Sequence, residues 1–222
     1  MNAAADLWAT RRDALQYLEA THPSRLEVLH CAFELMDECV SSFEDFSQGN
    51  QYAEVCGLAL LKVKHLAVGS YGLILDGLGQ ETGALMRPMI EYAELMTYFR
   101  MYPSKVGKIA TNTLPRAGER AKAIKGIYQH FRDHLNEHAS HSSFSQYSLG
   151  HLREPSTGKF KKMQRMVPHV LDTNVRDLVV QLIIFLREAG LALEPLGSPR
   201  FIEIAGGIDR LKARMLHAYS RK

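Results

Sequence analysis

The chain has few cysteines and little net charge, and these scarcities exclude several classes of protein. Only three of its 222 residues are cysteines, too few for a disulfide framework and without the paired spacing of a zinc ribbon. We therefore expect Cys31, Cys39 and Cys56 to be free, buried thiols in a protein of a reducing compartment. The formal net charge of +3 falls short of the strongly basic balance typical of nucleic-acid-binding domains.

Long apolar runs are also missing. The strongest run, LVVQLIIFLREAG at residues 178–190, reaches about half the length of a membrane-spanning helix. The first twenty residues mix acidic and basic side chains and lack the apolar stretch of a signal peptide. We therefore expect a cytoplasmic protein without a membrane partner. The sequence also lacks G-x-S-x-G and a complete phosphate loop, since PSTGKF at 155–160 has no glycine at the required distance.

What the sequence does contain is helical periodicity along nearly its whole length. With 46% hydrophobic and 23% charged residues, it has an ordinary globular composition. The pattern predicts an all-α fold, an antiparallel bundle of about six to seven helices without significant β-sheet. We expect one domain over 1–222, with its core at about 22–190 and a C-terminal helix at about 198–219. The expected helices span about 2–20, 25–46, 51–78, 84–102, 115–140, 170–190 and 198–219, with a turn at 76–83 and a long loop at 142–160.

The fourth of these helices carries a narrow polar stripe on an otherwise apolar surface. At 100° per residue, Arg87, Glu91, Glu94 and Tyr98 lie within about 60° of one another. A helix that is apolar nearly all round is normally buried, so its polar groups need partners inside the protein or in a cleft. Arg87 and Glu91 are spaced to form an ion pair, which is either part of a site or a weak surface bridge. If Pro88 opened this helix, Arg87 would become a cap residue.

The fifth helix carries a cluster of histidines in RDHLNEHASH, residues 132–141. Helical geometry places His138 on the apolar face and His134 and His141 beside it. Glu137 lies on the same margin as His141, whereas Arg132 falls on the opposite margin of the face. The apolar face itself is expected to contain Ile124, Ile127, Phe131 and Leu135.

One interpretation of this cluster is a zinc or iron site. His134, Glu137 and His138 form an H-x-x-E-H motif, whose histidines share one side of a helix. Glu91 and Glu94 could add carboxylate ligands, as in helical-bundle metal sites. A second helix with an E-x-x-H motif is missing from the sequence, so the pattern leaves this as an alternative to a site without a cofactor.

A second interpretation is a ribonuclease. Arg132 and His138 form R-x5-H, which resembles the R-x(4–6)-H motif of HEPN domains, helical proteins that often act as RNases in toxin and defence systems. The resemblance implies that the arginine stabilises phosphate charge and that the histidine transfers protons. On one straight helix the two side chains diverge by about 120°. A third interpretation is structural, with each histidine hydrogen-bonded at the edge of the core.

The order of features also resembles a family of uncharacterised bacterial helical proteins, over roughly residues 55–150. There a glycine-containing turn precedes an R-x-x-x-E helix that ends at an aromatic residue and proline, as in GLILDGLGQETGALMRPMIEYAELMTYFRMYP at 72–103. A downstream Leu-Ser-x-x-x-His pattern resembles Leu135 to His141 here, with Asn136 at the position usually held by serine. The resemblance implies a helical bundle with a polar cluster of Arg87, Glu91 and His141, and no known activity.

Together these patterns favour a HEPN-like protein that binds RNA or another phosphate-containing ligand, or cleaves RNA, and that forms a homo-oligomer through its helices. Whether it is an enzyme stays open at this point. The alternatives are the metal-binding bundle and a non-catalytic interaction protein. The candidate catalytic residues are Arg132, His138 and His141, and the candidate binding residues are Arg87, Glu91, Glu94 and Tyr98.

Overall fold

The computed structural model describes residues 3–138, 152–154, 156–161 and 164–220, which form the all-α protein that the sequence predicts. Its only β-type pairing among these residues is an isolated bridge between Arg153 and Phe160. The helices are α1 (Ala3–Thr21), α2 (Pro23–Glu44), α3 (Gln51–Leu75), α4 (Gly79–Met101), α5 (Ala117–Ala123), α6 (Gln129–His138), α8 (Pro168–Leu193) and α9 (Phe201–Ser220), with short 3₁₀ segments η1 (Pro103–Lys108) and η2 (Glu194–Leu196).

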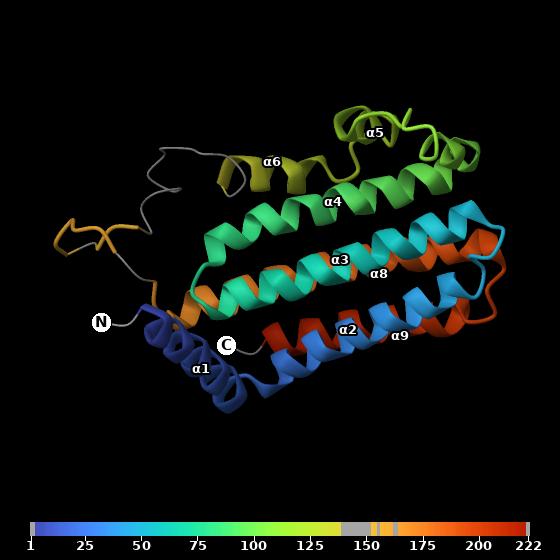
Figure 1. The fold of residues 1–222 in the computed structure, drawn as a ribbon. Coiled ribbons are helices and arrows are strands. Elements are labelled where there is room, and N and C mark those ends of the chain that lie inside the picture. Colours follow the sequence, from blue (N-terminus) through green and yellow to red (C-terminus); the bar gives the residue numbers. More distant parts are fainter. Residues whose placement is uncertain (1–2, 139–151, 155, 162–163, 221–222) are drawn as a thin grey trace.

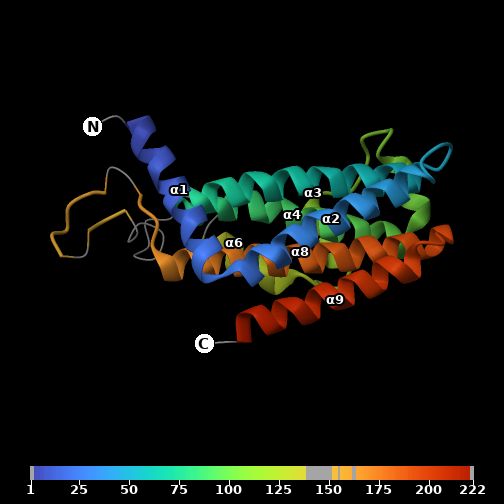
Figure 2. The ribbon, with the colours of Figure 1, turned by 90° about the horizontal axis from the view of Figure 1, so that it is seen from below.

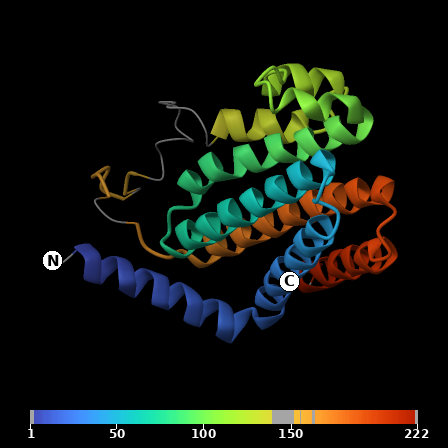
Figure 3. The same ribbon diagram turned by 45° about the vertical axis from the view of Figure 1, so that its right-hand side comes forward.

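The long helices lie roughly side by side in layers (Figures 1 and 3). α3 and α8 occupy the middle, α2 and α9 cover one side of them, and α4 covers the other. The short helices α5 and α6 lie across the outer side of α4, while α1 diverges from one end of the bundle (Figure 1). α4 therefore has neighbours on both sides, which explains why it is apolar nearly all round.

α3 is the most apolar of the long helices. It is the one helix of the described chain that is long and apolar enough to cross a membrane by length and composition, with a best-window mean hydropathy of 1.4. It also contacts α2, α4 and α8, and a central helix of a bundle meets the same criteria. Asn50 caps its start by accepting hydrogen bonds from the backbone N–H groups of Tyr52 and Ala53.

α4 begins earlier than the sequence predicts. The expected turn at 76–83 ends at Leu78, and the helix starts at Gly79. Gly77 supplies the positive φ of +77° that ends α3, a conformation favoured by glycine. Pro88 consequently lies inside α4 rather than at its start, so Arg87 is an interior helical residue and the proposed cap position for it is wrong.

The predicted continuous helix at 115–140 is wrong. It is broken between α5 and α6, where Lys125 and Gly126 both adopt positive φ angles of +61° and +64°. An α-helix cannot continue through left-handed residues. The sequence does not predict the break at Lys125, because lysine rarely adopts a positive φ. The break sets the direction of α6 independently of α5.

The three cysteines are free thiols, as expected. Cys39 and Cys56 are fully buried, and burial raises the pKa of each thiol from its usual value of 9.0 to about 12. Cys31 is half-buried on α2. The two buried thiols are therefore unreactive in the folded protein near neutral pH, because the thiolate is the reactive form.

Candidate functional site

The polar stripe of α4 faces α6, with Glu94 and Tyr98 buried and Arg87 and Glu91 half-buried. Arg87 Nε donates to Glu91 Oε1 at 3.4 Å, which forms the expected i, i+4 pair. Arg87 Nη1 also donates to Asn136 Oδ1 on α6. The first of these contacts follows from spacing on one helix, whereas the second joins two helices. Asn136 was identified only as a departure from the serine usual at that position.

A buried ion pair lies one turn further along α4. Arg132 Nη1 of α6 donates to Glu94 Oε2 at 2.6 Å. The Glu94 side chain is fully buried and Arg132 is 8% exposed. Burial raises the pKa of Glu94, and the charge of Arg132 and its hydrogen bond oppose this shift. The pair joins α6 to α4 in a place that water does not reach.

The expected position of Arg132 at the edge of the buried face is therefore wrong. Tyr128, Arg132 and Leu135 form the buried face of this region, whereas Ile127 is 54% exposed. The expected face was derived on the assumption of one straight helix from Ile124 onward, and the break at Gly126 invalidates that assumption. Because Arg132 is bound to Glu94, it is not free to contact a phosphate in this arrangement.

Tyr98 and Arg120 complete the surroundings of the buried pair. Tyr98 is buried and its ring lies 5.2 Å from that of Tyr102 and 5.8 Å from that of Phe99. Arg120 of α5 donates to the carbonyl of Pro115 at 2.7 Å. Burial lowers the pKa of the Arg120 guanidinium, and the nearby carboxylates Glu91 and Glu94 counteract this effect. The buried part of the α4 stripe, Glu94 and Tyr98, thus lies against α5 and α6.

The histidine cluster is only partly described. The side chain of His134 is exposed on α6, whereas His141 and the side chains of Glu137 and His138 lie outside the described residues. Within the described part of the chain, no group of three or more histidine, cysteine, aspartate or glutamate side chains is arranged to hold a metal ion. The zinc or iron set of His134, Glu137 and His138 stays a prediction.

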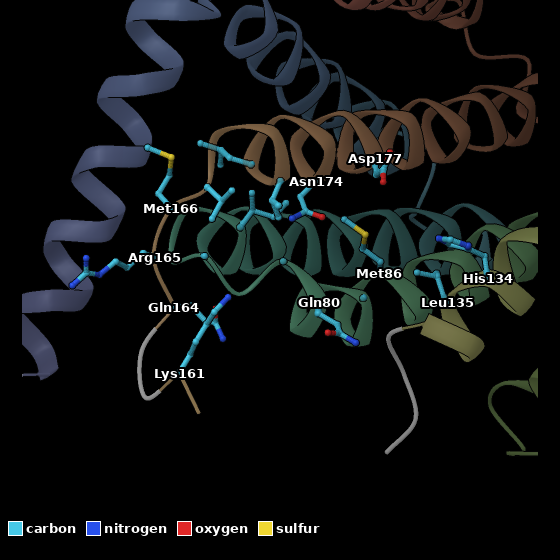
Figure 4. Close-up of a pocket in the computed structure, with 17 residues that line it drawn as sticks. Gln80, Met86, His134, Leu135, Lys161, Gln164, Arg165, Met166, Asn174 and Asp177 are labelled. Carbon is cyan, nitrogen blue, oxygen red and sulfur yellow. The ribbon is translucent and has the colours of Figure 1, made fainter. Parts of the chain in front are cut away.

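A pocket of about 370 Å³ lies beside this polar interface, and the sequence did not predict it. It is lined by the start of α4, the start of α8, residues 161 and 164–167, and one side of α6 (Figure 4). Its size is at the lower end of the range typical of small-molecule sites. Its apolar lining comprises Ile74, Met86, Leu135, Met166, Val167, Val170 and Leu171, and its polar lining comprises Gln80, His134, Lys161, Gln164, Arg165, Asn174 and Asp177.

The cations of the pocket lie at one end of it. Lys161 and Gln164 lie together there, Arg165 lies at the same end with its guanidinium directed away from them, and His134 and Leu135 lie at the other end (Figure 4). Neither Lys161 nor Arg165 forms an ion pair with any described residue, while Asp177 is paired with Arg176 at 3.1 Å. The pocket thus offers unneutralised positive charge beside an apolar surface.

Local backbone structure sets the position of these cations. Residues 152–154 pair with residues 159–161: the Lys161 N–H donates to the Leu152 carbonyl at 2.8 Å and the Glu154 N–H donates to the Lys159 carbonyl at 2.8 Å. Gly158, with φ of +67°, lies between these two segments. In the sequence these lysines indicated only a solvated basic loop, since nothing in the pattern places the loop against α4 and α8.

The start of α4 approaches α8 closely at the same pocket. A β-carbon at Gly79 would lie 2.7 Å from Asn174 Cγ, and one at Gly77 would lie 3.2 Å from the carbonyl oxygen of Arg165. Both distances are shorter than real β-carbon contacts allow without movement. The glycines of DGLGQETG therefore permit close approach at the pocket wall as well as a turn.

α4 and α6 each contribute residues to both the pocket and the polar interface. Met86 lines the pocket and its neighbour Arg87 contacts α6, while His134 and Leu135 line the pocket and their neighbour Asn136 accepts from Arg87. The Arg132–Glu94 ion pair and the Arg87–Asn136 hydrogen bond between α4 and α6 therefore hold one wall of the pocket in place.

Comparison of the chain with known protein families, with curated proteins and with solved structures finds no match. The protein is all-helical, and its function has to be inferred from the pocket and the polar interface alone.

Proposed function

We propose that the pocket binds a phosphate-containing ligand, a nucleotide or a segment of RNA. The observation that carries this proposal is the presence of two cations, Lys161 and Arg165, without ion-pair partners among the described residues, in the lining of a pocket that also contains apolar side chains and neutral amides. Arginine and lysine are the usual partners of phosphate oxygens, because charged hydrogen bonds are stronger than neutral ones.

The rest of the lining supports the same kind of ligand. Gln80, Gln164 and Asn174 are neutral amides that can both donate and accept, which suits the edges of nucleic acid bases. The apolar side chains between the two ends suit the flat face of a base. In this proposal the Arg87–Asn136 and Arg132–Glu94 contacts hold α6 in place and do not bind the ligand.

The two family resemblances agree with this proposal. In the uncharacterised helical family, the residue at the position of Asn136 is usually serine, and here that position contacts the arginine of the R-x-x-x-E helix. HEPN domains act on RNA. We accordingly place the chain among HEPN-like helical proteins as part of the same proposal.

The binding test uses purified protein and a fluorescently labelled single-stranded RNA oligomer, with nucleoside monophosphates as competitors. We expect Lys161→Gln/Arg165→Gln to weaken binding by about 10-fold or more, since each charged hydrogen bond contributes about 1.5–3 kcal/mol. The slope of log affinity against log salt concentration should also become shallower by about 1–2.

The matched control is Lys62→Gln/Lys122→Gln, which removes two exposed lysines from α3 and α5. It changes the net charge equally and should leave most of the affinity intact. Equal weakening by both double variants would mean that binding is non-specific. Absence of binding to RNA and to nucleotides by the wild-type protein would overturn the proposed function.

Ribonuclease activity is a second candidate, because His134 lines the end of the pocket opposite Lys161, where it would face a neighbouring phosphate of a bound RNA segment. A histidine within reach of a bound phosphate can transfer protons during cleavage. We expect His134→Ala to reduce cleavage of single-stranded RNA by about 100-fold, the lower range for loss of an acid–base group, without lowering the melting temperature. The HEPN resemblance predicts the same for His138→Ala and His141→Ala.

His65→Ala serves as the control for this cleavage assay, since it removes an exposed histidine from α3. Full cleavage by His134→Ala, His138→Ala and His141→Ala alike would leave ligand binding as the function of the pocket and exclude these histidines from catalysis.

A further inference from the structure

The wall that α8 contributes to the pocket carries two polar residues on one face. Asn174 and Asp177 both line the pocket and are three residues apart, so they lie about 60° from each other around the helix and about 4.5 Å apart along it. In Figure 4 Asp177 lies toward Met86 and His134. Lys161 lies at the opposite end of the pocket (Figure 4). The pocket therefore has a cationic end and, further along α8, a carboxylate.

The carboxylate of Asp177 can still accept hydrogen bonds from a ligand. Its Oδ1 accepts from Arg176 Nε at 3.2 Å and from Arg176 Nη2 at 3.1 Å, and its Oδ2 forms no hydrogen bond with a described residue. The two side chains are about half exposed, at 48% and 45%, and an ion pair between such neighbours contributes little to stability. Because a carboxylate has about four acceptor positions, Asp177 can bind N–H groups of a ligand while it is paired with Arg176.

A carboxylate distinguishes the four RNA bases by the groups along their Watson–Crick edges. Guanine has two adjacent donors there, the N1–H and the 2-amino group. Adenine and cytosine each place a ring-nitrogen acceptor beside their amino group, and uracil places a carbonyl on each side of its N3–H. These acceptors are repelled by a carboxylate, because no proton lies between the two acceptors. Guanine is therefore the one base of the four that offers a carboxylate two donors side by side.

We propose that the pocket selects a guanine nucleotide and that Asp177 is the residue that determines this specificity. The N1–H and the 2-amino group of guanine donate to the Asp177 carboxylate, which makes both hydrogen bonds charge-assisted. Asn174 lies next to Asp177 on the same face, and its amide can bind the group beside these donors, since it both donates and accepts. The phosphate lies at the Lys161 end. This inference rests on the proposed function, because it names the base of a ligand of the same pocket.

The length of the pocket agrees with a nucleotide. Val167 and Asp177 both line it and are ten residues apart, which is roughly 15 Å along α8. A nucleotide has its phosphate and the Watson–Crick edge of its base at opposite ends, so it can reach both ends of the pocket, which inorganic phosphate cannot. Leu171, between these two positions, offers an apolar surface to the base. The required chemistry, a guanine base with a phosphate, occurs both in free GMP and in RNA.

The first test compares ligands by calorimetric titration of the purified full-length protein. We expect GMP to bind about 10-fold or more tightly than AMP, CMP or UMP, because it makes one more charge-assisted hydrogen bond. Inosine monophosphate, which lacks the 2-amino group, should bind about 10-fold more weakly than GMP for the same reason.

The RNA oligomers UUGUU and UUAUU show whether the guanine is bound as part of a strand. A preference for UUGUU without binding of GMP would assign the site to RNA, and tight binding of GMP without this preference would assign it to the free nucleotide. Equal affinities for all four nucleotides and for both oligomers would overturn guanine selection and leave the proposed function in place. Absence of binding by every one of them would overturn both.

The second test exchanges the specificity at Asp177. Xanthosine monophosphate carries an oxygen in place of the 2-amino group of GMP, so an amide at position 177 can donate to it and a carboxylate cannot. We expect Asp177→Asn to bind GMP about 10-fold more weakly than the wild type and xanthosine monophosphate about 10-fold more tightly, with an unchanged melting temperature.

The matched control is Asp209→Asn, which makes the same change at an exposed position of α9, at the edge of the bundle (Figure 2). It should keep the preference of the wild type for GMP. An unchanged ratio of the two affinities in Asp177→Asn would overturn the assignment of Asp177, because loss of stability alone would not exchange one ligand for the other.

Discussion

Arg132→Met is expected to lower the free energy of unfolding by about 3–5 kcal/mol, which is the usual cost of removing one partner of a buried ion pair. Glu94 would be left as a fully buried carboxylate without its hydrogen-bond donor. Its second oxygen already lacks a hydrogen-bond partner among the described residues, and the nearby Arg120 donates to the Pro115 carbonyl. Denaturation by urea, followed by circular dichroism, measures the change.

A double-mutant cycle makes this prediction specific to the pair. Glu94→Leu alone should cost a similar amount, whereas Glu94→Leu/Arg132→Met should cost clearly less than the two single changes added together, since neither charge is then left unpaired. Lys122→Met, at an exposed position on α5, is the control and should change stability by less than about 0.5 kcal/mol. Additive losses in the double variant would mean that Arg132 and Glu94 do not interact.

The second large effect is expected at Glu188, the buried carboxylate that joins α8 to α4. Its Oε2 accepts a hydrogen bond from Thr97 Oγ1 at 2.8 Å and from Arg100 Nη2 at 3.3 Å, and the residue is only 3% exposed. Burial also raises the pKa of the neighbouring Tyr128, with a further contribution from the Glu188 carboxylate. Glu188→Leu should cost about 3–5 kcal/mol of unfolding free energy, because two donors lose their acceptor.

Two further variants serve as comparisons for Glu188→Leu. Glu188→Gln keeps an oxygen that can accept from Thr97 and should cost less, about 1–3 kcal/mol. Glu34→Leu removes an exposed glutamate from α2 and should have little effect. If Glu188→Leu were as stable as the wild type, the carboxylate would contribute nothing beyond its volume to the contact between α4 and α8.

Much of the fold could be predicted because it depends on local signals. The ends of the long helices follow from capping residues and from proline, such as Asn50 before α3 and Pro103 after α4. The prediction was wrong where the local signal was weak. Gly79 begins a helix despite its poor helical propensity, and Lys125 adopts a positive φ that no rule assigns to lysine.

The site was predictable only within single helices. The Arg87–Glu91 pair follows from a spacing of four residues, but Glu94 and Arg132 are 38 residues apart and meet because α6 packs on α4. The pocket depends on three segments that are distant in the sequence, so its lining could not be derived from periodicity. A basic loop and a glycine-rich turn were both noted in the sequence, and only the fold brings them together.

The close approach of Gly79 to Asn174 limits which mutations of codon 79 leave the pocket lining unchanged. Any single-base change of a glycine codon that alters the amino acid adds a β-carbon, and at this position the added carbon would push the Asn174 amide away from its place in the pocket lining. No amino acid that a single-base change can introduce at position 79 therefore fits without moving Asn174. Every amino-acid change at that codon moves the Asn174 amide and so alters one polar group of the pocket lining.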